Sequence, residues 1–394
     1  MKRVLLVSLL CLLMLPAVAH RYPFIRTDKS VLQYPAGQSP DYELFLRKLD
    51  TLVRGGRGDV RVLHVGGSHV QGGTLSDRLR KHFLSLRYGM DGGRGLVFPF
   101  AAALTNTPVS YNTSYIGNWE SVTCLKPADE ELGLTGMLIT AQDTSARVIV
   151  DLLSRETLQM QHRYCFNRVD ILGGGELEPV LLLQGRDTLR GVVGADFAHF
   201  DLPYYTDWVQ IAFCGTPGQK FALRGVYLDK SSGGFSLSEA GVNGASTQSW
   251  LHCTKWQQDL WRMHPDLIIF SIGINDIQGA DFDEARFRAH YRRLMDMARR
   301  VNPHCAFLFT GINDSWTRRG VNPHTAAAEQ AFRDLAKEYK AVFWDMYAVM
   351  GGAGSMAQWL EAGLAQPDKV HFSANGYKVI GDLLFGAIMD NWRR

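Results

Sequence analysis

Apolar runs of strand length alternate with amphipathic stretches of helical spacing in two parts of the chain. The expected buried strands are residues 60–65, 267–272, 306–310 and 341–344. The expected helices are residues 40–52, 74–86, 284–298, 326–339 and the segment after Ser373, and Asp281 and Glu284 have capping-box spacing at the start of the third. Strands that are buried on both faces are continuous apolar runs, and their alternation with helices is typical of a parallel sheet. The pattern predicts an α/β fold with a doubly wound parallel sheet flanked by helices.

A different pattern occupies residues 108–232. Short alternating segments such as 146–152, 180–183, 208–213 and 221–228 are separated by the turn sequences Gly173-Gly174-Gly175 and Thr216-Pro217-Gly218. Alternation with a period of two is typical of strands with one buried face. We therefore predict an inserted antiparallel β-sandwich, which divides the α/β domain into residues 20–107 and residues 233–394.

The first nineteen residues have the features of a secretory signal peptide. Lys2 and Arg3 precede an apolar stretch, residues 4–15, and Ala17-Val18-Ala19 follows as a cleavage site. The apolar stretch is too short to span a bilayer comfortably. We expect a mature chain that begins near His20 and is secreted or periplasmic, with no stable membrane insertion.

The charge balance argues against one class of partner. The sequence has 42 Lys and Arg and 39 Asp and Glu, and loss of the signal peptide removes Lys2 and Arg3 but no acidic residue. Domains that bind nucleic acid carry a clear excess of basic residues. We therefore expect no nucleic-acid partner.

The cysteines indicate neither a metal site nor a fixed set of disulfides. The mature chain would retain five, and no two of them form a C-x-x-C pair: Cys124, Cys165, Cys214, Cys253 and Cys305. Cys165 and Cys214 lie in the same β-rich region, where either a disulfide or two buried free thiols would fit. We expect no metal ion.

Ser68 is the first candidate for chemistry. It lies in the glycine-rich turn after the strand 60–65 and before the helix 74–86. The carboxyl ends of parallel strands form the usual site crevice of such a sheet, and a serine there can act as a nucleophile. A serine in such a turn also commonly caps the helix that follows.

Asp368 and His371 form a second candidate, directly before the last helix. The spacing D-x-x-H lets a short loop present the imidazole while the carboxylate contacts its Nδ1 and fixes the tautomer. Alone, the motif would also fit a structural loop in which the carboxylate caps a turn.

Two more loops end at the same predicted edge of the sheet. Asn275, in Gly273-Ile274-Asn275-Asp276, can donate its amide to an oxyanion. Gly244, within residues 241–246, has an N–H that a ligand can approach because no Cβ stands in the way. The letters G-I-N-D recur at 311–314 and make Asn313 an alternative donor, although the order of the motifs favours Asn275.

Three further side chains near these motifs have open roles. His69 follows Ser68 and would lie either in the cleft or behind it, whereas His64, inside the strand, would be packed. Arg94 lies among glycines and would bind either a carboxylate of the protein or the substrate.

The four segments, in this order, resemble the blocks of the SGNH (GDSL-like) hydrolase family. These blocks are residues 65–69, 241–246, 273–276 and 368–371, and the resemblance covers residues 40–105 and 235–394. It implies a serine hydrolase with Ser68 as nucleophile, His371 as base and Asp368 as the carboxylate that orients the base. It also implies an oxyanion hole formed by the N–H groups of Ser68 and Gly244 and the side chain of Asn275, with no metal or organic cofactor.

A narrower resemblance is to the subgroup that contains peptidoglycan O-acetylesterases. It rests on Gly67-Ser68-His69 after a strand, on residues 93–100 and 344–352, and on the β insertion between the first two blocks. In that subgroup the insertion is a carbohydrate-binding-module-like sandwich, which implies an acylated glycan as the substrate. One departure is Gly67, because the family usually has Asp before the nucleophile, and a support of the turn is then missing.

These resemblances imply a secreted serine esterase that removes acetyl or other small acyl groups from a carbohydrate, such as peptidoglycan, through an acyl-enzyme. An O-acetyltransferase would use the same triad, with a sugar hydroxyl in place of water. Gly67 and the insertion leave a third alternative, a non-catalytic carbohydrate-binding or scaffold protein with a degenerate hydrolase domain.

Overall fold

The computed structural model describes residues 18, 20–153, 164–183 and 187–392. The predicted signal peptide, residues 1–19, lies outside the described residues except for Val18. Within the described part of the chain, every helix is too short or too polar to cross a membrane.

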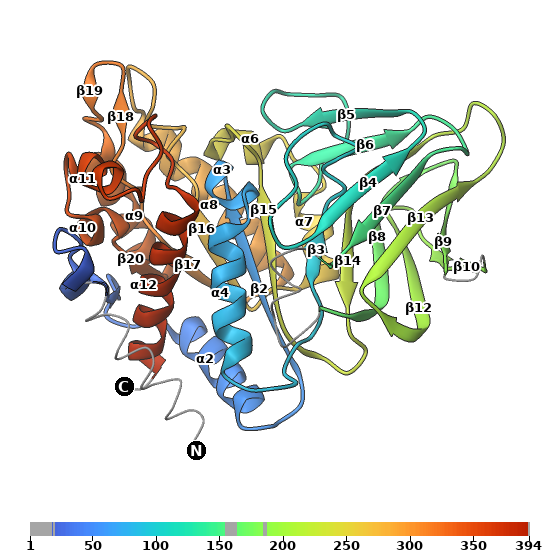
Figure 1. The fold of residues 1–394 in the computed structure, drawn as a ribbon, viewed down its shortest axis with the longest axis horizontal. Helices are drawn as coiled ribbons and strands as arrows, with labels where there is room; N and C mark the ends of the chain where they lie inside the picture. Colours follow the sequence, from blue (N-terminus) through green and yellow to red (C-terminus); the bar gives the residue numbers. More distant parts are fainter. Residues whose placement is uncertain (1–17, 19, 154–163, 184–186, 393–394) are drawn as a thin grey trace.

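One sheet of six strands forms the centre of the α/β domain (Figure 1). Its order is β1 (Leu32–Gln33), β20 (Val342–Trp344), β17 (Ala306–Phe309), β16 (Leu267–Ser271), β2 (Asp59–Gly66) and β15 (Gly234–Gly241). The five strands from β20 to β15 pair in parallel, whereas β1 pairs antiparallel with β20. Strands β16, β17 and β20 are apolar and almost wholly buried because helices cover both faces of the sheet. This confirms the predicted parallel sheet.

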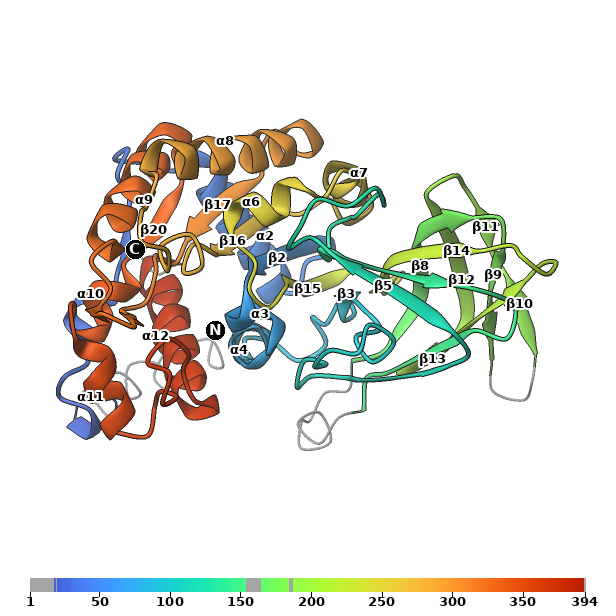
Figure 2. The same ribbon diagram turned by 90° about the horizontal axis from the view of Figure 1, so that it is seen from above.

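Ten helices of the described chain belong to this domain. They are α2 (Pro40–Val53), α3 (Ser68–Gln71), α4 (Thr74–Ser85), α6 (Thr247–Leu251), α7 (Trp256–Met263), α8 (Glu284–Val301), α9 (Thr325–Tyr339), α10 (Met346–Met350), α11 (Ser355–Glu361) and α12 (Ala374–Trp392). Figure 2 shows α4 and α12 on one side of the sheet and α8 and α9 on the other. The cap of α8 differs from the prediction: the side chain of Asp283, not Asp281, accepts from the N–H of Arg286. Helix α8 therefore begins two residues later than a cap at Asp281 would require.

Two antiparallel sheets form the inserted domain (Figures 1 and 2). The five-stranded sheet has the order β10 (Thr188–Arg190), β9 (Glu178–Leu182), β13 (Trp208–Cys214), β7 (Arg147–Asp151) and β4 (Asn112–Ile116). The seven-stranded sheet has the order β11 (Val192–Val193), β12 (Phe197–Thr206), β8 (Phe166–Gly175), β14 (Phe221–Asp229), β6 (Met137–Ala141) and β5 (Trp119–Thr123), with β3 (Gly95–Val97) on β14. The two sheets meet through aromatic side chains, since the rings of Phe213 and Phe221 are 5.3 Å apart. The inserted antiparallel domain is thus confirmed.

The antiparallel sheet begins earlier in the chain than the predicted boundary. Strand β3 pairs with β14 from Gly95 onward, although residue 108 was the expected start of the insertion. Three residues give no periodicity, so the sequence offers no sign of this strand. On the C-terminal side, β15 returns to the parallel sheet at Gly234.

The five described cysteines are free thiols: Cys124, Cys165, Cys214, Cys253 and Cys305. Of the two alternatives for Cys165 and Cys214, the structure therefore has the unpaired one. Burial raises the pKa of the Cys305 thiol above its usual value, so this cysteine stays protonated and packs as a small apolar residue.

A buried ion cluster joins the parallel sheet to the segment that leads into the insertion. Glu239 in β15 accepts from Arg80 Nη2 at 2.9 Å and from Arg94 Nη2 at 2.5 Å, and both arginines are almost completely buried. Arg94 also lies over the ring of Tyr111. Burial opposes ionisation of Glu239, but the two guanidinium groups outweigh it and lower its pKa. Of the two roles open to Arg94, the structure shows the bond to a protein carboxylate.

Removing the carboxylate from this cluster should destabilise the protein strongly. Glu239→Ala leaves two buried guanidinium groups without their shared counter-ion, so we expect the free energy of unfolding to fall by about 3–5 kcal/mol. The matched control is Glu178→Ala, since Glu178 pairs with Arg190 at an exposed site and should contribute less than about 1 kcal/mol. Urea unfolding of the two variants would contradict this account if the losses were equal.

Candidate active site

Ser68 lies at the carboxyl ends of three parallel strands, and these strand ends fix its position. Gly66, the last residue of β2, is in register with Gly241 of β15 and with Ser271 of β16. Helix α3 begins two residues later, at Ser68, and lies directly against these strand ends. A Cβ on Gly66 would stand 2.3 Å from Val70 Cγ2, so only glycine permits this close approach.

Ser68, His371 and Asp368 form a continuous chain of hydrogen bonds. Ser68 Oγ lies 2.7 Å from His371 Nε2, and His371 Nδ1 lies 2.7 Å from Asp368 Oδ2. The other carboxylate oxygen of Asp368 accepts from the N–H groups of Val370 and His371 at 2.9 and 3.0 Å. Burial opposes ionisation of Asp368, but these hydrogen bonds outweigh it and hold the pKa of Asp368 below its usual value. An ionised carboxylate thus fixes the imidazole so that Nε2 faces the serine.

The loop that carries Asp368 and His371 is anchored to the next loop of the sheet. Asn313 Nδ2 donates to the carbonyl of Val370 at 2.9 Å, and the N–H of Trp316 donates to the carbonyl of Lys369 at 3.1 Å. These bonds hold the loop between α11 and α12 by the backbone of the two residues that directly precede His371. The second G-I-N-D segment therefore positions the loop that carries His371. The side chain of Asn313 is itself buried.

Three hydrogen-bond donors lie at or near the serine turn. Among the described residues, the N–H groups of Ser68 and Gly244 donate to no protein acceptor. Asn275 Nδ2 donates one hydrogen to the carbonyl of Ala245 at 2.8 Å, which leaves its second hydrogen free. A Cβ built on Gly67 would lie 3.4 Å from the same nitrogen, so the amide stands beside the backbone of the serine turn. Asn275 and the segment that carries Gly244 thus lie beside the serine turn, since the carbonyls of Ala245 and Val242 would stand 3.5 and 3.7 Å from a Cβ on Gly67.

Asp276 connects the two loops that supply Gly244 and Asn275. Its carboxylate accepts from the N–H of Thr247 at 3.0 Å and from Thr247 Oγ1 at 2.5 Å. Burial raises the pKa of Asp276 to about 6, against the opposing effect of these hydrogen bonds. The contact holds the start of α6, directly after the glycine segment, against the end of β16.

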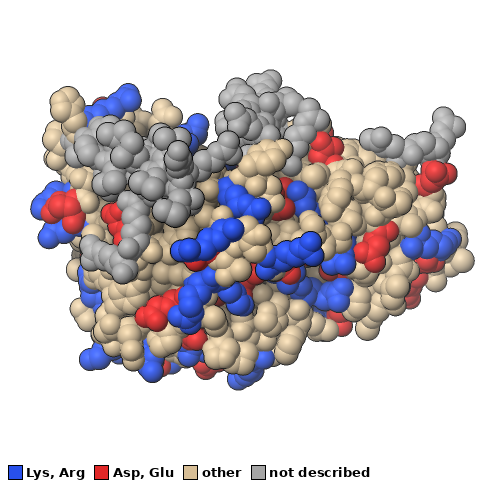
Figure 3. Space-filling model, turned by 90° about the horizontal axis from the view of Figure 1, so that it is seen from below, with Lys and Arg blue, Asp and Glu red and all other residues tan. Residues whose placement is uncertain are grey.

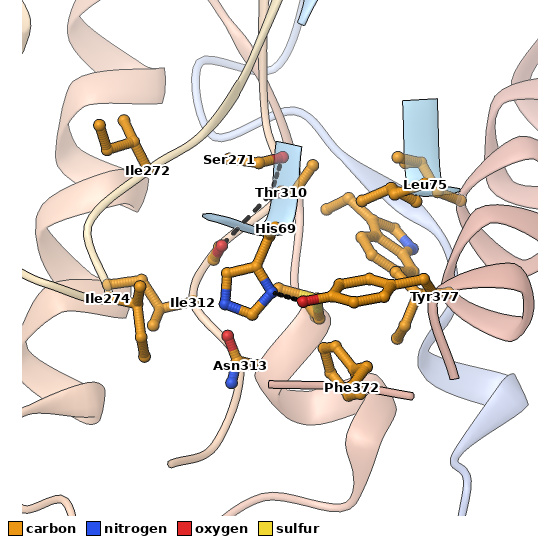
Figure 4. A pocket seen from close by; sticks show the side chains of 15 residues that line it. His69, Leu75, Ser271, Ile272, Ile274, Thr310, Ile312, Asn313, Phe372 and Tyr377 are labelled. Carbon is orange, nitrogen blue, oxygen red and sulfur yellow. Dashed lines mark hydrogen bonds between the residues drawn. The ribbon is translucent and has the colours of Figure 1, made fainter. Parts of the chain in front are cut away.

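His69 lies behind the base and packs against it. Its ring stacks on that of His371 with 5.3 Å between centroids, and its Nδ1 is 2.8 Å from the hydroxyl of Tyr377. Figure 4 shows the ring in a small cavity of about 20 Å³, with Tyr377 and Phe372 on one side and Ile274, Ile312 and Asn313 on the other. Burial, and secondarily the charge of His371, lowers the pKa of His69 to about 3. His69 is therefore a neutral support of the base, behind the cleft.

His64 is packed inside β2, as predicted. Its ring nitrogens lie 2.8 Å from Ser76 Oγ and 2.8 Å from Ser271 Oγ, and burial lowers its pKa to about 3. Ser271 in turn bonds Thr310 (Figure 4).

Two residues near the site, Tyr377 and Leu125, could not be assigned to it from the sequence. Tyr377 belongs to the apolar face of the last helix, and only the fold shows that its hydroxyl meets His69. Leu125, in the loop after β5, lies 3.8 Å from the position that a Cβ on Gly244 would take and is 43% exposed. This loop is anchored because His252 Nδ1 contacts the carbonyl of Cys124 at 2.7 Å. The inserted domain thus contributes an apolar side chain to the edge of the site.

The low pKa of His69 predicts a specific dependence of stability on pH. In the unfolded chain a histidine binds a proton near pH 6.5, whereas His69 in the folded chain binds one only near pH 3. Between these values the unfolded state holds the extra proton, so the free energy of unfolding falls as the pH falls, by up to about 1.4 kcal/mol per pH unit for this residue. His69→Phe keeps a ring against His371 and should reduce the slope measured by urea unfolding between pH 6 and 4. Equal slopes in both proteins would contradict the prediction.

The fold is that of a solved peptidoglycan O-acetylesterase. The two structures superpose with a TM-score of 0.75 at 24% identity, over 92% of this chain and 99% of the other. A family two carbohydrate esterase from Cellvibrio japonicus covers 72% of this chain and 100% of its own, but at 11% identity and a TM-score of 0.31 the likeness carries no argument. None of the curated proteins compared matches this sequence.

A family comparison adds evidence from the C-terminal part of the sequence. Residues 213–379 match the GDSL-like lipase/acylhydrolase family. This segment contains Gly244, Asn275, Asp368 and His371, while Ser68 lies outside it and is identified by its contact with His371. Residues 213–379 are thus similar in sequence to the GDSL-like (SGNH) hydrolases, and the chain shares the fold of a peptidoglycan O-acetylesterase.

Proposed function

We propose that this chain is an exported serine esterase that removes acetyl or other small acyl groups from a carbohydrate, with peptidoglycan as the first substrate to test. The observation that carries the proposal is the bonded chain Ser68–His371–Asp368 beside three unused hydrogen-bond donors. Such an arrangement activates a hydroxyl and stabilises the oxyanion that its attack creates.

The geometry supports a two-step reaction. His371 Nε2 takes the proton of Ser68 as Oγ attacks the ester carbonyl, and the N–H groups of Ser68 and Gly244 and the amide of Asn275 stabilise the resulting oxyanion. Collapse of this intermediate breaks the ester bond, and His371 returns the proton to the sugar oxygen that leaves. Water, deprotonated by His371, then attacks the acyl-enzyme and releases the acid, and Ser68 recovers its proton.

Two features support a carbohydrate as the alcohol part of the ester. The first is the shared fold over 92% of the chain, inserted domain included, with a peptidoglycan O-acetylesterase. The second is the position of Leu125, which brings the inserted domain to the edge of the site. Export is proposed from the signal-peptide features of residues 1–19.

Removal of either reacting group should abolish most turnover. Ser68→Ala removes the nucleophile and His371→Ala the base, and the double variant should be no slower than the worse single one because the two act as a unit. The measurements are 4-nitrophenyl acetate hydrolysis and acetate release from O-acetylated peptidoglycan. A Ser68→Ala protein that kept wild-type rates on both would overturn the proposal, whereas acyl transfer to added sugar acceptors would identify an acetyltransferase.

Substitution of Asn275 and substitution of Asn313 should have different effects on activity and stability. Asn275→Ala removes a donor that acts only on the tetrahedral intermediate, so we expect kcat to fall by about 100-fold with little change in KM. Asn313→Ala removes a buried bond to Val370, so we expect a loss of about 1–3 kcal/mol in the free energy of unfolding and a smaller fall in kcat. Interchangeable effects of the two variants would contradict these assignments.

A further inference from the structure

A groove of about 820 Å³ opens directly beside the catalytic carboxylate. Asp368 is one of its lining residues, and most of the others belong to the hairpin of β18 (Trp316–Thr317) and β19 (Gly320–Val321) or to the segments of Pro323 and Gln278. The hairpin projects at the same end of the molecule as α3 (Figure 1). A polymer bound at Ser68 therefore has room to continue along the hairpin.

The wall of this groove carries positive charge that the protein leaves unmatched. Arg318 and Arg319 are the two residues of the hairpin turn, both are exposed, and neither forms an ion pair with any described residue. A third cation, Lys369, lies with Nζ 3.6 Å from the ring centre of Trp316, which lines the same groove. Asp368 is the acidic residue of the lining, and its oxygens are already bonded to His371 and to backbone N–H groups.

The opposite face of the molecule also carries basic side chains, but there they lie among acidic ones. Figure 3 shows a band of Lys and Arg there, with acidic side chains among them. Among the described residues, paired cations include Lys48 with Asp266 at 2.6 Å and Arg54 with Asp50 at 2.6 Å. The hairpin differs because both of its arginines are exposed and neither forms an ion pair with a described residue, which leaves their guanidinium groups available to an external anion.

The hairpin is also connected to the loop that carries His371 by a backbone hydrogen bond. The N–H of Trp316 donates to the carbonyl of Lys369, two residues before His371. A group held by the hairpin is therefore held at a fixed place relative to the catalytic loop. This connection makes the groove part of substrate positioning rather than a separate site.

We propose that this groove binds a carboxylate-bearing part of the glycan, so that the preferred substrate is an anionic O-acylated glycan rather than a neutral one. The inference rests on the proposed function and adds the charge of the substrate to it. Arg318 and Arg319 bind the carboxylate by charge-assisted hydrogen bonds, while Trp316 and Pro323 offer apolar surface to the sugar rings.

The test uses one polymer in two charge states. O-acetylated peptidoglycan, whose stem peptides carry carboxylates, is compared with the same material after its carboxylates are converted to amides. For each variant, kcat/KM for acetate release is divided by its own kcat/KM on 4-nitrophenyl acetate. We expect the wild-type protein to prefer the carboxylated polymer, and R318Q/R319Q to lose about fivefold to tenfold of that preference. Rising salt should reduce the wild-type preference in the same direction.

Two further variants test whether the preference for the carboxylated polymer depends on positive charge at the hairpin. R47Q/R57Q removes two exposed cations from α2 and the loop before β2, far from the groove, and should retain the wild-type preference. R318K/R319K retains the charge and should keep most of the preference. Equal rates on the two polymers, or an unchanged preference in R318Q/R319Q, would overturn this inference alone. Hydrolysis of 4-nitrophenyl acetate without acetate release from either polymer would overturn the proposed substrate and this inference with it.

Discussion

The close contact of α3 with the ends of β2 and β15 is the constraint on which the site depends. A Cβ on Gly66 would lie 2.3 Å from Val70 Cγ2 of α3, and one on Gly241 would lie 2.3 Å from the N–H nitrogen of Gln71. Two glycines in register therefore let a short helix sit on the strand ends without a layer of side chains between them. Ser68, the first residue of that helix, is placed by backbone packing rather than by its own side-chain contacts.

The base reaches the serine from the far end of the sequence through a second set of backbone contacts. The loop that carries His371 is held by Asn313 and Trp316, which follow β17 at the same edge of the sheet. Behind it, His69 stacks on the imidazole and stays neutral because burial lowers its pKa to about 3. A neutral neighbour matters, because His371 becomes positively charged during the reaction and a second charge beside it would oppose this.

The parts of the structure that the sequence predicted are those with a repeated or local signal. The parallel strands are continuous apolar runs, and D-x-x-H places Asp368 and His371 within one short loop. The parts that it missed depend on distant partners. Strand β3 has three residues and is defined by its pairing with β14, and Arg94 shows its role only because Glu239, far along the chain, lies beside it. The hairpin β18–β19 likewise has two-residue strands, too short for any periodic pattern.

The absence of the family's usual Asp before the nucleophile is compensated by contacts elsewhere in the site. Gly67 has a φ of −95°, which lies outside the left-handed region that favours glycine. A side chain at this position would begin 3.4 Å from Asn275 Nδ2, where a carboxylate could hold the amide. In this chain the carbonyl of Ala245 holds that amide instead, and Asp276 ties the same two loops together through Thr247. The two loops that carry the donors proposed for the oxyanion hole are thus held against each other without a carboxylate at position 67.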